Sequence, residues 1–293
     1  MLELFQLIVA GLATGSIYAL AAVGFVLLWQ TSHTINFAQG EFVMLPAVFV
    51  LIAMKFGGGV PLWVAIFIAV AVTLLLLGAV FKYAIVDPLI PHGVLPLVIA
   101  TIAVALLMRD AVREFYSAEA HPFPHLVPDG LINIGGVVVS AAEIGILVVA
   151  LIAIGALQLF LNRTKTGRAM QATAQNPSVA RILGIPVDRM ILYTFLINAG
   201  LAAIASILVS PIYLVKFSNG EVLGLVAFTA AIVGGFNQIR GAIVGGLLIG
   251  VVDNLSAVYF STAYRQAFPL ILLILIIIFR PQGLLGRREE RTI

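Results

Sequence analysis

Two short stretches of the sequence share a glycine followed by a glutamate at the start of an apolar run. Residues 37–45 (FAQGEFVML) and 217–225 (FSNGEVLGL) match at Phe, Gly, Glu and Leu, and a glutamine in the first copy faces an asparagine in the second. Free backbone N–H groups and the helix dipole at such a start attract a carboxylate ligand. The candidate pathway or substrate contacts are therefore Asn36, Gln39, Gly40, Glu41, Asn219, Gly220 and Glu221. The glutamates are also explained as first-turn acids, and the asparagines as caps or turn residues.

A second polar pair, Asp253 and Asn254, lies deep inside an apolar run. Asp253 follows Arg240 by 13 residues, which places it ~20 Å along an α-helix. A carboxylate at such a depth in a membrane is costly unless it is paired or hydrated. Two roles remain open for this pair: a group in a transport pathway or gate, and an interhelical hydrogen bond.

The residues that would support enzyme chemistry in this chain are missing or scattered. The chain has no cysteine and no Gly-x4-Gly-Lys-Ser/Thr motif, so we expect it to hydrolyse no ATP itself. His121, His125 and Asp129 recur every four residues, but intervening prolines prevent one helix face, so we expect ordinary loop histidines and no metal site.

The composition predicts an all-α polytopic membrane protein. Hydrophobic residues make up 62% of the 293 residues and charged residues only 10%, where soluble domains carry roughly 25% charged residues. This composition excludes a soluble enzyme. The Lys and Arg residues behind the net charge of +3 lie between apolar runs, which does not form a nucleic-acid-binding face. We expect a single domain over 1–293 with about nine (eight to ten) helices, some of them short or broken. The candidate spans are 4–29, 42–54, 61–81, 94–108, 142–161, 190–213, 222–236, 241–260 and 267–279.

The distribution of Lys and Arg predicts the orientation of these spans. Segments 162–189 and 280–293 are rich in arginine and are expected on the cytoplasmic side, which places segment 109–140 outside as a cap with a small hairpin. The acidic Glu3 argues against a signal peptide, so we expect a retained first span with an extracytoplasmic N-terminus. This topology places the two Gly-Glu copies on opposite sides of the membrane, as in an inverted repeat.

Small and aromatic residues predict packing and membrane anchoring. Gly241, Gly245, Gly246 and Gly250 form a ladder that lets another helix approach closely, either in this chain or in a second subunit. Tyr18 is expected to anchor the chain at the membrane interface.

The expected cytoplasmic loop contains a short amphipathic helix. Asn176 is predicted as its N-cap, Pro177 as its first residue and Gly184 as the residue after its end. Val179, Ile182 and Leu183 share one face. Such a helix either docks into a groove of a partner or lies on its own protein or on lipid.

The sequence of this loop resembles that of the branched-chain amino acid permease family of ABC importers, the LivH/LivM type. The resembling residues are Gly167, Arg168 and Ala169, followed by Asn176-Pro177 and Ala180-Arg181-Ile182-Leu183-Gly184. Segments 15–20, 35–42, 234–246 and 280–286 resemble further signatures in the same order, and the length favours the LivH-like member. Departures at Gln39, Pro46 and Asn237 leave the substrate open, since sister systems carry urea, amides or small organic and aromatic acids.

The resemblance implies a permease subunit in a bacterial inner membrane, with no cofactor bound by this chain. ATP and magnesium would bind to two cytoplasmic ATPase subunits that dock on the coupling residues. A second permease (LivM-like or a second copy), an extracytoplasmic substrate-binding protein and membrane lipid would complete the assembly, without nucleic acid. Two alternatives compete: a secondary transporter that uses Glu41, Glu221 or Asp253 as an ion site, and, less favoured, an integral-membrane enzyme.

Overall fold

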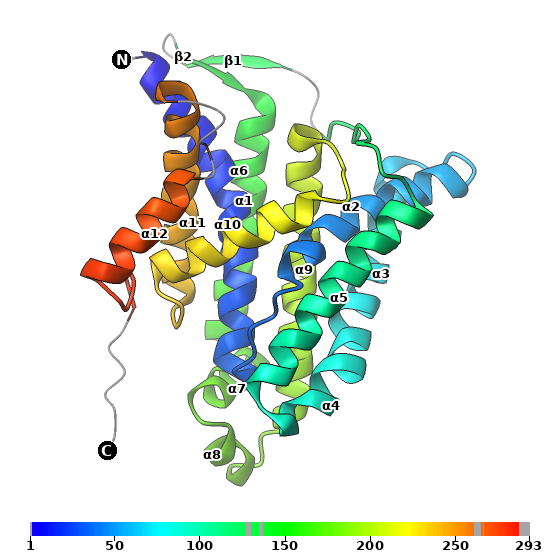
Figure 1. The fold of residues 1–293 in the computed structure, drawn as a ribbon, viewed down its shortest axis with the longest axis vertical. Coiled ribbons are helices and arrows are strands. Elements are labelled where there is room, and N and C mark those ends of the chain that lie inside the picture. The colour runs from blue at the N-terminus through cyan, green and yellow to red at the C-terminus, as the bar shows by residue number, and fades with distance from the viewer. Residues whose placement is uncertain (1, 127–129, 135–136, 261–264, 266, 287–293) are drawn as a thin grey trace.

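Helices form nearly all of the fold, as the composition predicts. The computed structural model describes residues 2–126, 130–134, 137–260, 265 and 267–286 (Figure 1). Seven helical segments in this part of the chain are long and apolar enough to cross a membrane. They are α1 (Leu2–Ser32), α2 (Gln39–Phe56), the segment Leu62–His92, α5 (Val94–Phe115), α6 (Ala141–Arg163), α9 (Val187–Tyr213) and α11 (Ile239–Tyr259).

Two further apolar helices, α10 (Asn219–Gly234) and α12 (Ala267–Phe279), are shorter than these seven. The count of nine spans depends on whether both cross the bilayer, and it stays a prediction. The segment Leu62–His92 changes its hydrogen-bonding pattern along its length. It comprises α3 (Leu62–Thr73), the π-helical stretches η1 (Leu74–Val80) and η2 (Lys82–Val86), α4 (Asp87–Leu89) and the 3₁₀ turn η3 (Ile90–His92).

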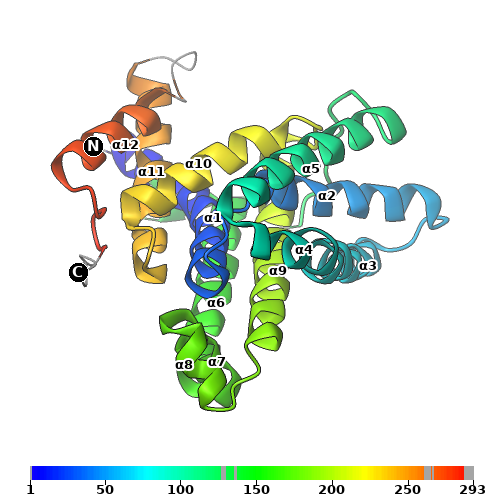
Figure 2. The same ribbon diagram turned by 60° about the horizontal axis from the view of Figure 1, so that its bottom comes forward.

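The two ends of the molecule carry different elements. One end, here called the hairpin side, holds the antiparallel strands β1 (Leu131–Ile134) and β2 (Val137–Ser140), which confirms the predicted hairpin. Ser140 and Glu143 then form a capping box that starts α6. The opposite end, the coupling side, holds α7 (Lys165–Gln175) and α8 (Pro177–Ile182), which project beyond the ends of α6 and α9 (Figure 2).

The helix α1 lies at the centre of the bundle and is apolar on all sides, so most of its length is buried. Its neighbour α11 approaches so closely that a methyl group at Gly250 would overlap the backbone of Gly15, and one at Gly246 would overlap Ala19. Gly241 and Gly245 contact the backbone of α10 in the same manner. The glycine ladder is therefore a packing surface, and its partners α1 and α10 belong to this chain.

The two Gly-Glu copies meet inside the bundle. The chain leaves α1 on the coupling side and turns back before α2 begins, whereas it leaves α9 on the hairpin side and turns back before α10 begins (Figure 1). A methyl group at Gly40 would overlap the Gly220 carbonyl and touch Gly224. The expectation that the copies lie on opposite sides is wrong, because each return segment brings its short helix back to the same depth.

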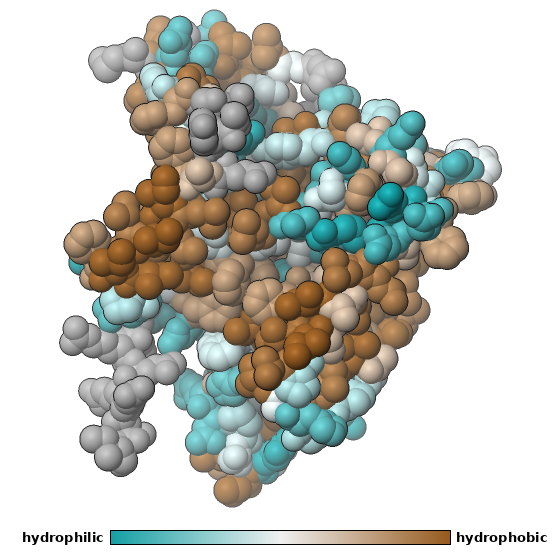
Figure 3. Space-filling view, viewed as in Figure 1, coloured by the Kyte–Doolittle hydropathy of each residue, from teal (hydrophilic) through white to brown (hydrophobic). Residues whose placement is uncertain are grey.

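The helix α5 continues past the predicted end at Met108 to Phe115. Arg109 and Arg113 are therefore on a helix and not in the surface cap, because an arginine inside a helix is tolerated where it has an acidic partner. Nearer its start, α5 exposes Leu95, Ile99 and Leu106. Figure 3 shows apolar surface over α5 and over α12, with polar surface gathered at the far end of α5.

Candidate functional site

Arg109 joins the starts of both short helices. From α5 its guanidinium donates to Glu41 Oε1 on α2, with nitrogen–oxygen distances of 3.2 and 3.4 Å, and to Glu221 Oε2 on α10 at 2.8 Å. The side chain of Glu41 is 2% exposed, whereas that of Glu221 is 66% exposed. One arginine therefore holds two acids in different surroundings.

The second oxygen of Glu41 is buried against the start of α10. Among the described residues, Glu41 Oε2 has no hydrogen-bond partner, and a methyl group at Gly220 would overlap this carboxylate. A glycine at position 220 is thus needed for the approach. The negative carboxylate next to a helix N-terminus is also electrostatically favourable. Gly40, Glu41, Gly220 and Glu221, predicted from two distant stretches, form one cluster.

The polar residues around this cluster have structural partners. Asn36 Oδ1 accepts from the Ala38 N–H at 3.0 Å, and Asn219 donates from Nδ2 to the Leu214 carbonyl at 2.7 Å. Asn36 thus stabilises the turn before α2, and Asn219 is the first residue of α10, bonded to the turn before it; their pathway roles stay predictions. Gln39 is fully buried and exchanges two hydrogen bonds with Asn198 on α9, at 2.8 and 2.9 Å. Its amide is therefore occupied inside the core in this arrangement, and its role as a substrate contact stays a prediction.

Asp253 lies in a second polar cluster nearer the hairpin side. Its carboxylate accepts two hydrogen bonds from Arg265, each 2.7 Å long, and one from the Tyr18 hydroxyl at 3.1 Å. Arg265 also donates to the Tyr213 hydroxyl at 2.8 Å. The hydrogen bonds to Asp253 raise the pKa of Arg265 above its usual value, so the guanidinium stays charged. Tyr18 is buried in this cluster, so its prediction as an interface anchor is wrong.

These groups line a cavity of about 260 Å³ together with Asn219 from α10. The cavity has a charged pair at Asp253 and Arg265, and an apolar wall that comprises Val222, Leu223, Val226 and Pro269. Asn254 does not line it. Its Nδ2 donates to Thr14 Oγ1 at 3.3 Å and to the Gly250 carbonyl at 3.1 Å, which is the interhelical hydrogen bond considered for the pair.

The projecting helix α8 has the caps that its sequence predicts. Asn176 Oδ1 accepts from the N–H groups of Ser178 and Val179 at 3.0 Å, Pro177 is the first helical residue, and Gly184 has φ +79°. Its apolar residues face outward: Val179 is 49% exposed, Ile182 84% and Leu183 71%. A two-turn helix with two caps thus presents an uncovered apolar face.

The preceding helix α7 is fixed to the bundle by a tight turn. Gly167 packs on the backbone of Phe160 and Leu161, where a methyl group would overlap, and Ala169 packs against the core. Arg168 is exposed, and Arg181 lies 3.7 Å from Asp188 with both side chains in solvent. The coupling residues therefore divide into a packed hinge and an exposed tip.

Within the described residues, no group of three histidine, aspartate or glutamate side chains is placed to hold a metal. His121 pairs through its backbone with Val215, at 2.9 and 2.8 Å. This ties the cap segment to the turn before α10. Asp129 lies outside the described residues.

Sequence reasoning missed Arg109, Arg265 and Tyr213, which complete both clusters. The chance to find them from the sequence was small. Arg109 stands at the end of an apolar run, where the positive charge is as typical of a loop as of a buried ion pair. The only signal is the rule that a carboxylate at membrane depth needs a cation.

Comparison with known proteins identifies the family. The family model described as "Branched-chain amino acid transport system / permease component" matches residues 7–277. The chain belongs to this family. The high-affinity branched-chain amino acid transport system permease protein BraD of Pseudomonas aeruginosa is 35% identical, with 98% of this chain and 97% of BraD covered. The corresponding LivH protein of Escherichia coli is 31% identical, with 97% and 96% covered.

The fold is also found in a solved structure of low sequence identity. PsaBC from Streptococcus pneumoniae, in complex with Fab, aligns over 93% of this chain and 91% of that chain, with a TM-score of 0.53 and 12% identity. At this identity the likeness shows the arrangement of helices alone. This chain therefore shares its arrangement of helices with a protein of very different sequence.

Proposed function

We propose that this chain is a permease subunit of an ATP-driven importer that carries branched-chain amino acids. The observation that carries the proposal is α8. A helix of two turns gains little stability by itself, yet here it is capped at both ends and exposes Val179, Ile182 and Leu183. This is the form of a helix that inserts into a groove of a partner. In this family the partner is an ATPase subunit.

The assignment of sides follows from the docking role. The coupling side, with α7 and α8, faces the cytoplasm because ATP is there, and residues 280–286 after α12 pack against the end of α10 on the same side. The hairpin side and the N-terminus then face outward, where a substrate-binding protein delivers its ligand. ATP and magnesium bind to two ATPase subunits, and a second permease, LivM-like or identical, completes the membrane part.

The cavity at Asp253 has the chemistry of the proposed substrate. A zwitterionic amino acid has one carboxylate for Arg265 and one ammonium for Asp253, while its aliphatic side chain fits the wall that contains Val222, Leu223 and Val226. Because Arg265 and Asp253 neutralise each other when the cavity is empty, the charges remain paired in both states. We place the substrate contact of this subunit here.

The junction of α2 and α10 has the properties of a gate. It joins two helix starts through Arg109, and its close contacts at Gly40 and Gly220 change if either helix moves. Short helices that start inside the bundle are typical of transport pathways. The Arg109 cluster therefore holds the two halves of the repeat in one arrangement.

Co-purification followed by reconstitution tests the proposal. The tagged chain is extracted from its native membrane, the proteins that travel with it are identified, and the complex is placed in vesicles. We expect a second permease, one or two ATPases, and ATP-dependent uptake of L-leucine, L-isoleucine or L-valine. Uptake of urea, amides or aromatic acids instead would reassign the substrate. A chain that arrives alone and transports with an ion gradient would refute the importer.

A further inference from the structure

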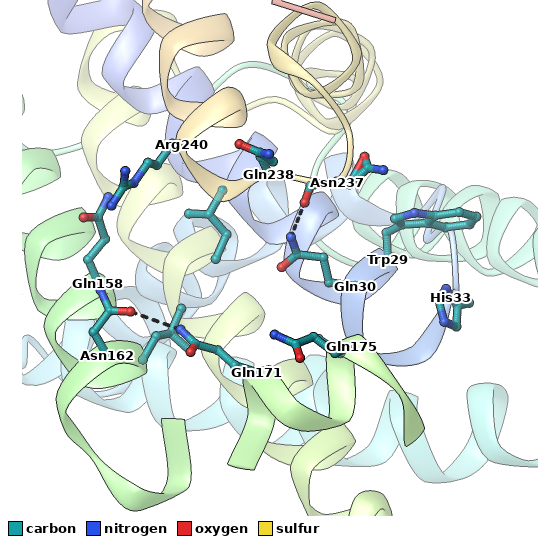
Figure 4. A pocket seen from close by; sticks show the side chains of 13 residues that line it. Trp29, Gln30, His33, Gln158, Asn162, Gln171, Gln175, Asn237, Gln238 and Arg240 are labelled. Atoms are coloured by element: carbon teal, nitrogen blue, oxygen red, sulfur yellow. Dashed lines mark hydrogen bonds between the residues drawn. The ribbon is translucent and has the colours of Figure 1, made fainter. Parts of the chain in front are cut away.

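A cavity of about 560 Å³ opens on the coupling side of the molecule (Figure 4). It lies between the end of α1, the end of α6, the helix α7 and the turn that joins α10 to α11. Pockets that bind small molecules measure ~300–1,000 Å³, so its size is sufficient for a ligand. None of its lining residues belongs to the Arg109 cluster or to the Asp253 cavity.

Neutral amide side chains dominate the polar part of this lining. Gln30 comes from α1, Gln158 from α6, and Gln171 and Gln175 from α7 (Figure 4). An amide both donates and accepts hydrogen bonds, so these groups can serve either charged end of a small zwitterion. Among the described lining residues, Arg240 is the one permanently charged side chain and none is acidic. The cavity therefore favours a solute that carries a carboxylate.

Apart from the amides, Arg240 and His33, the lining is apolar. The indole of Trp29 and the side chains of Leu161, Ala174 and Ile239 contribute to the wall. A cation, several amides and an apolar wall together complement a free α-amino acid with an apolar side chain. The carboxylate would bind Arg240, the ammonium would donate to amide carbonyls, and the side chain would pack near Trp29.

We propose that this cavity is a regulatory site that binds a free apolar α-amino acid from the cytoplasm and slows the importer. The inference rests on the proposed function, because it needs the coupling side to face the compartment in which the product accumulates. The site differs from the Asp253 cavity in its side of the molecule and in its lining.

The walls of the cavity explain how a ligand would act on coupling. In one wall, Gln30 Nε2 donates a hydrogen bond to the Asn237 carbonyl at 2.5 Å, which connects α1 to the α10–α11 turn. In the other wall, Gln171 Nε2 donates a hydrogen bond to Asn162 Oδ1 at 3.1 Å, which connects α7 to α6. A ligand that contacts both walls fixes their separation, and α7 continues directly into the exposed α8.

Such a ligand stabilises the conformation in which both walls can reach it. It shifts the conformational equilibrium by its difference in affinity between states. If transport requires α7 to move relative to α1, the bound amino acid opposes that movement. The effect is inhibition from the product side.

The test uses the whole complex in vesicles with the ATPases inside. Vesicles are loaded with ATP and increasing L-leucine, and the initial uptake of labelled L-leucine is measured. We expect internal L-leucine to lower the rate. In Arg240→Gln the internal concentration that halves the rate should rise about tenfold or more, as expected when one charge-assisted hydrogen bond is lost. Gln175→Leu, which removes one amide from the lining, should shift it in the same direction.

Arg163→Gln is the matched control, because Arg163 is an exposed arginine at the end of α6 and does not line the cavity. It should be inhibited like the unmodified chain. Equal inhibition in Arg240→Gln and in the unmodified complex would overturn the site, as would uptake that internal L-leucine never slows. A fall in uptake by Arg240→Gln in vesicles without internal L-leucine would instead make the cavity part of the exit path. Absence of ATP-dependent L-leucine uptake in the unmodified complex would refute the proposed function itself.

Discussion

The contacts of Arg109 predict that its two acids contribute very differently to stability. Its pair with Glu41 is buried, since the Glu41 side chain is 2% exposed, and removal of the arginine leaves that carboxylate without compensation. Breaking a buried pair in this way costs ~3–5 kcal/mol. The pair with Glu221 is shorter, at 2.8 Å, but its acid is 66% exposed, and such exposed pairs contribute ~0–1 kcal/mol. Burial, and not distance, should decide the result.

Equilibrium unfolding of the purified chain in mixed micelles with increasing SDS measures these differences. We expect Arg109→Gln to lower the free energy of unfolding by ~3–5 kcal/mol, and Glu221→Gln by less than ~1 kcal/mol. Adding Glu41→Gln to Arg109→Gln should restore most of the loss, because no uncompensated charge then remains in the core. Arg113→Gln, one turn further along α5 and exposed, is the control and should change stability by ~0.5 kcal/mol or less.

Two results would refute this reasoning about the Arg109 cluster. If Glu221→Gln destabilised the chain as much as Arg109→Gln, the exposed acid would be the important partner. If the Arg109→Gln/Glu41→Gln variant were no more stable than Arg109→Gln, the Glu41 carboxylate would not be the source of the cost. A coupling energy near zero in this double-mutant cycle would have the same meaning.

Three further predictions concern coupling, packing and the substrate cavity. Ile182→Asp should abolish stimulation of the ATPase while the chain remains in the membrane; normal stimulation would contradict docking through α8. Gly24→Ala should lower the melting temperature by an amount equivalent to ~1–3 kcal/mol, because the methyl group overlaps the Asn198 amide, whereas Gly155→Ala, with open space around it, should not. Equal melting temperatures would argue against that overlap. Asp253→Asn should reduce uptake at least about tenfold at unchanged expression, because the loss of one charge-assisted hydrogen bond has an effect of this size. Unchanged uptake would remove the residue from the pathway.

Features that depend on neighbours in the sequence were predictable. The caps of α8 at Asn176 and Gly184 involve groups within a few residues, so residue type and spacing are sufficient. The apolar runs predicted the helices, because a backbone in lipid must satisfy its hydrogen bonds within the segment. The glycine ladder predicted close helix packing for a similar reason, since only a missing side chain permits it.

The ends of helices were less predictable than their existence. Arg109 marks the expected end of a span by its charge, yet α5 continues to Phe115, and the guanidinium pairs with Glu41 in the core and with the exposed Glu221. The residue type alone indicates that an unpaired charge in lipid is costly, but it does not show which distant residue pairs with that charge. The same limit applies to Tyr18, whose hydroxyl binds Asp253 and not the membrane interface.

The sequence by itself determined that the chain is a bundle of membrane helices with a small capped helix on one loop, because these properties follow from local composition and spacing. It also marked the Gly-Glu repeat, but not its meeting point. Only the tertiary structure decided that Gly40 and Gly220 touch, that Gln39 exchanges hydrogen bonds with Asn198, and that Arg265 pairs with Asp253. Contacts between residues far apart in the chain depend on how whole helices pack, and no local pattern encodes that geometry.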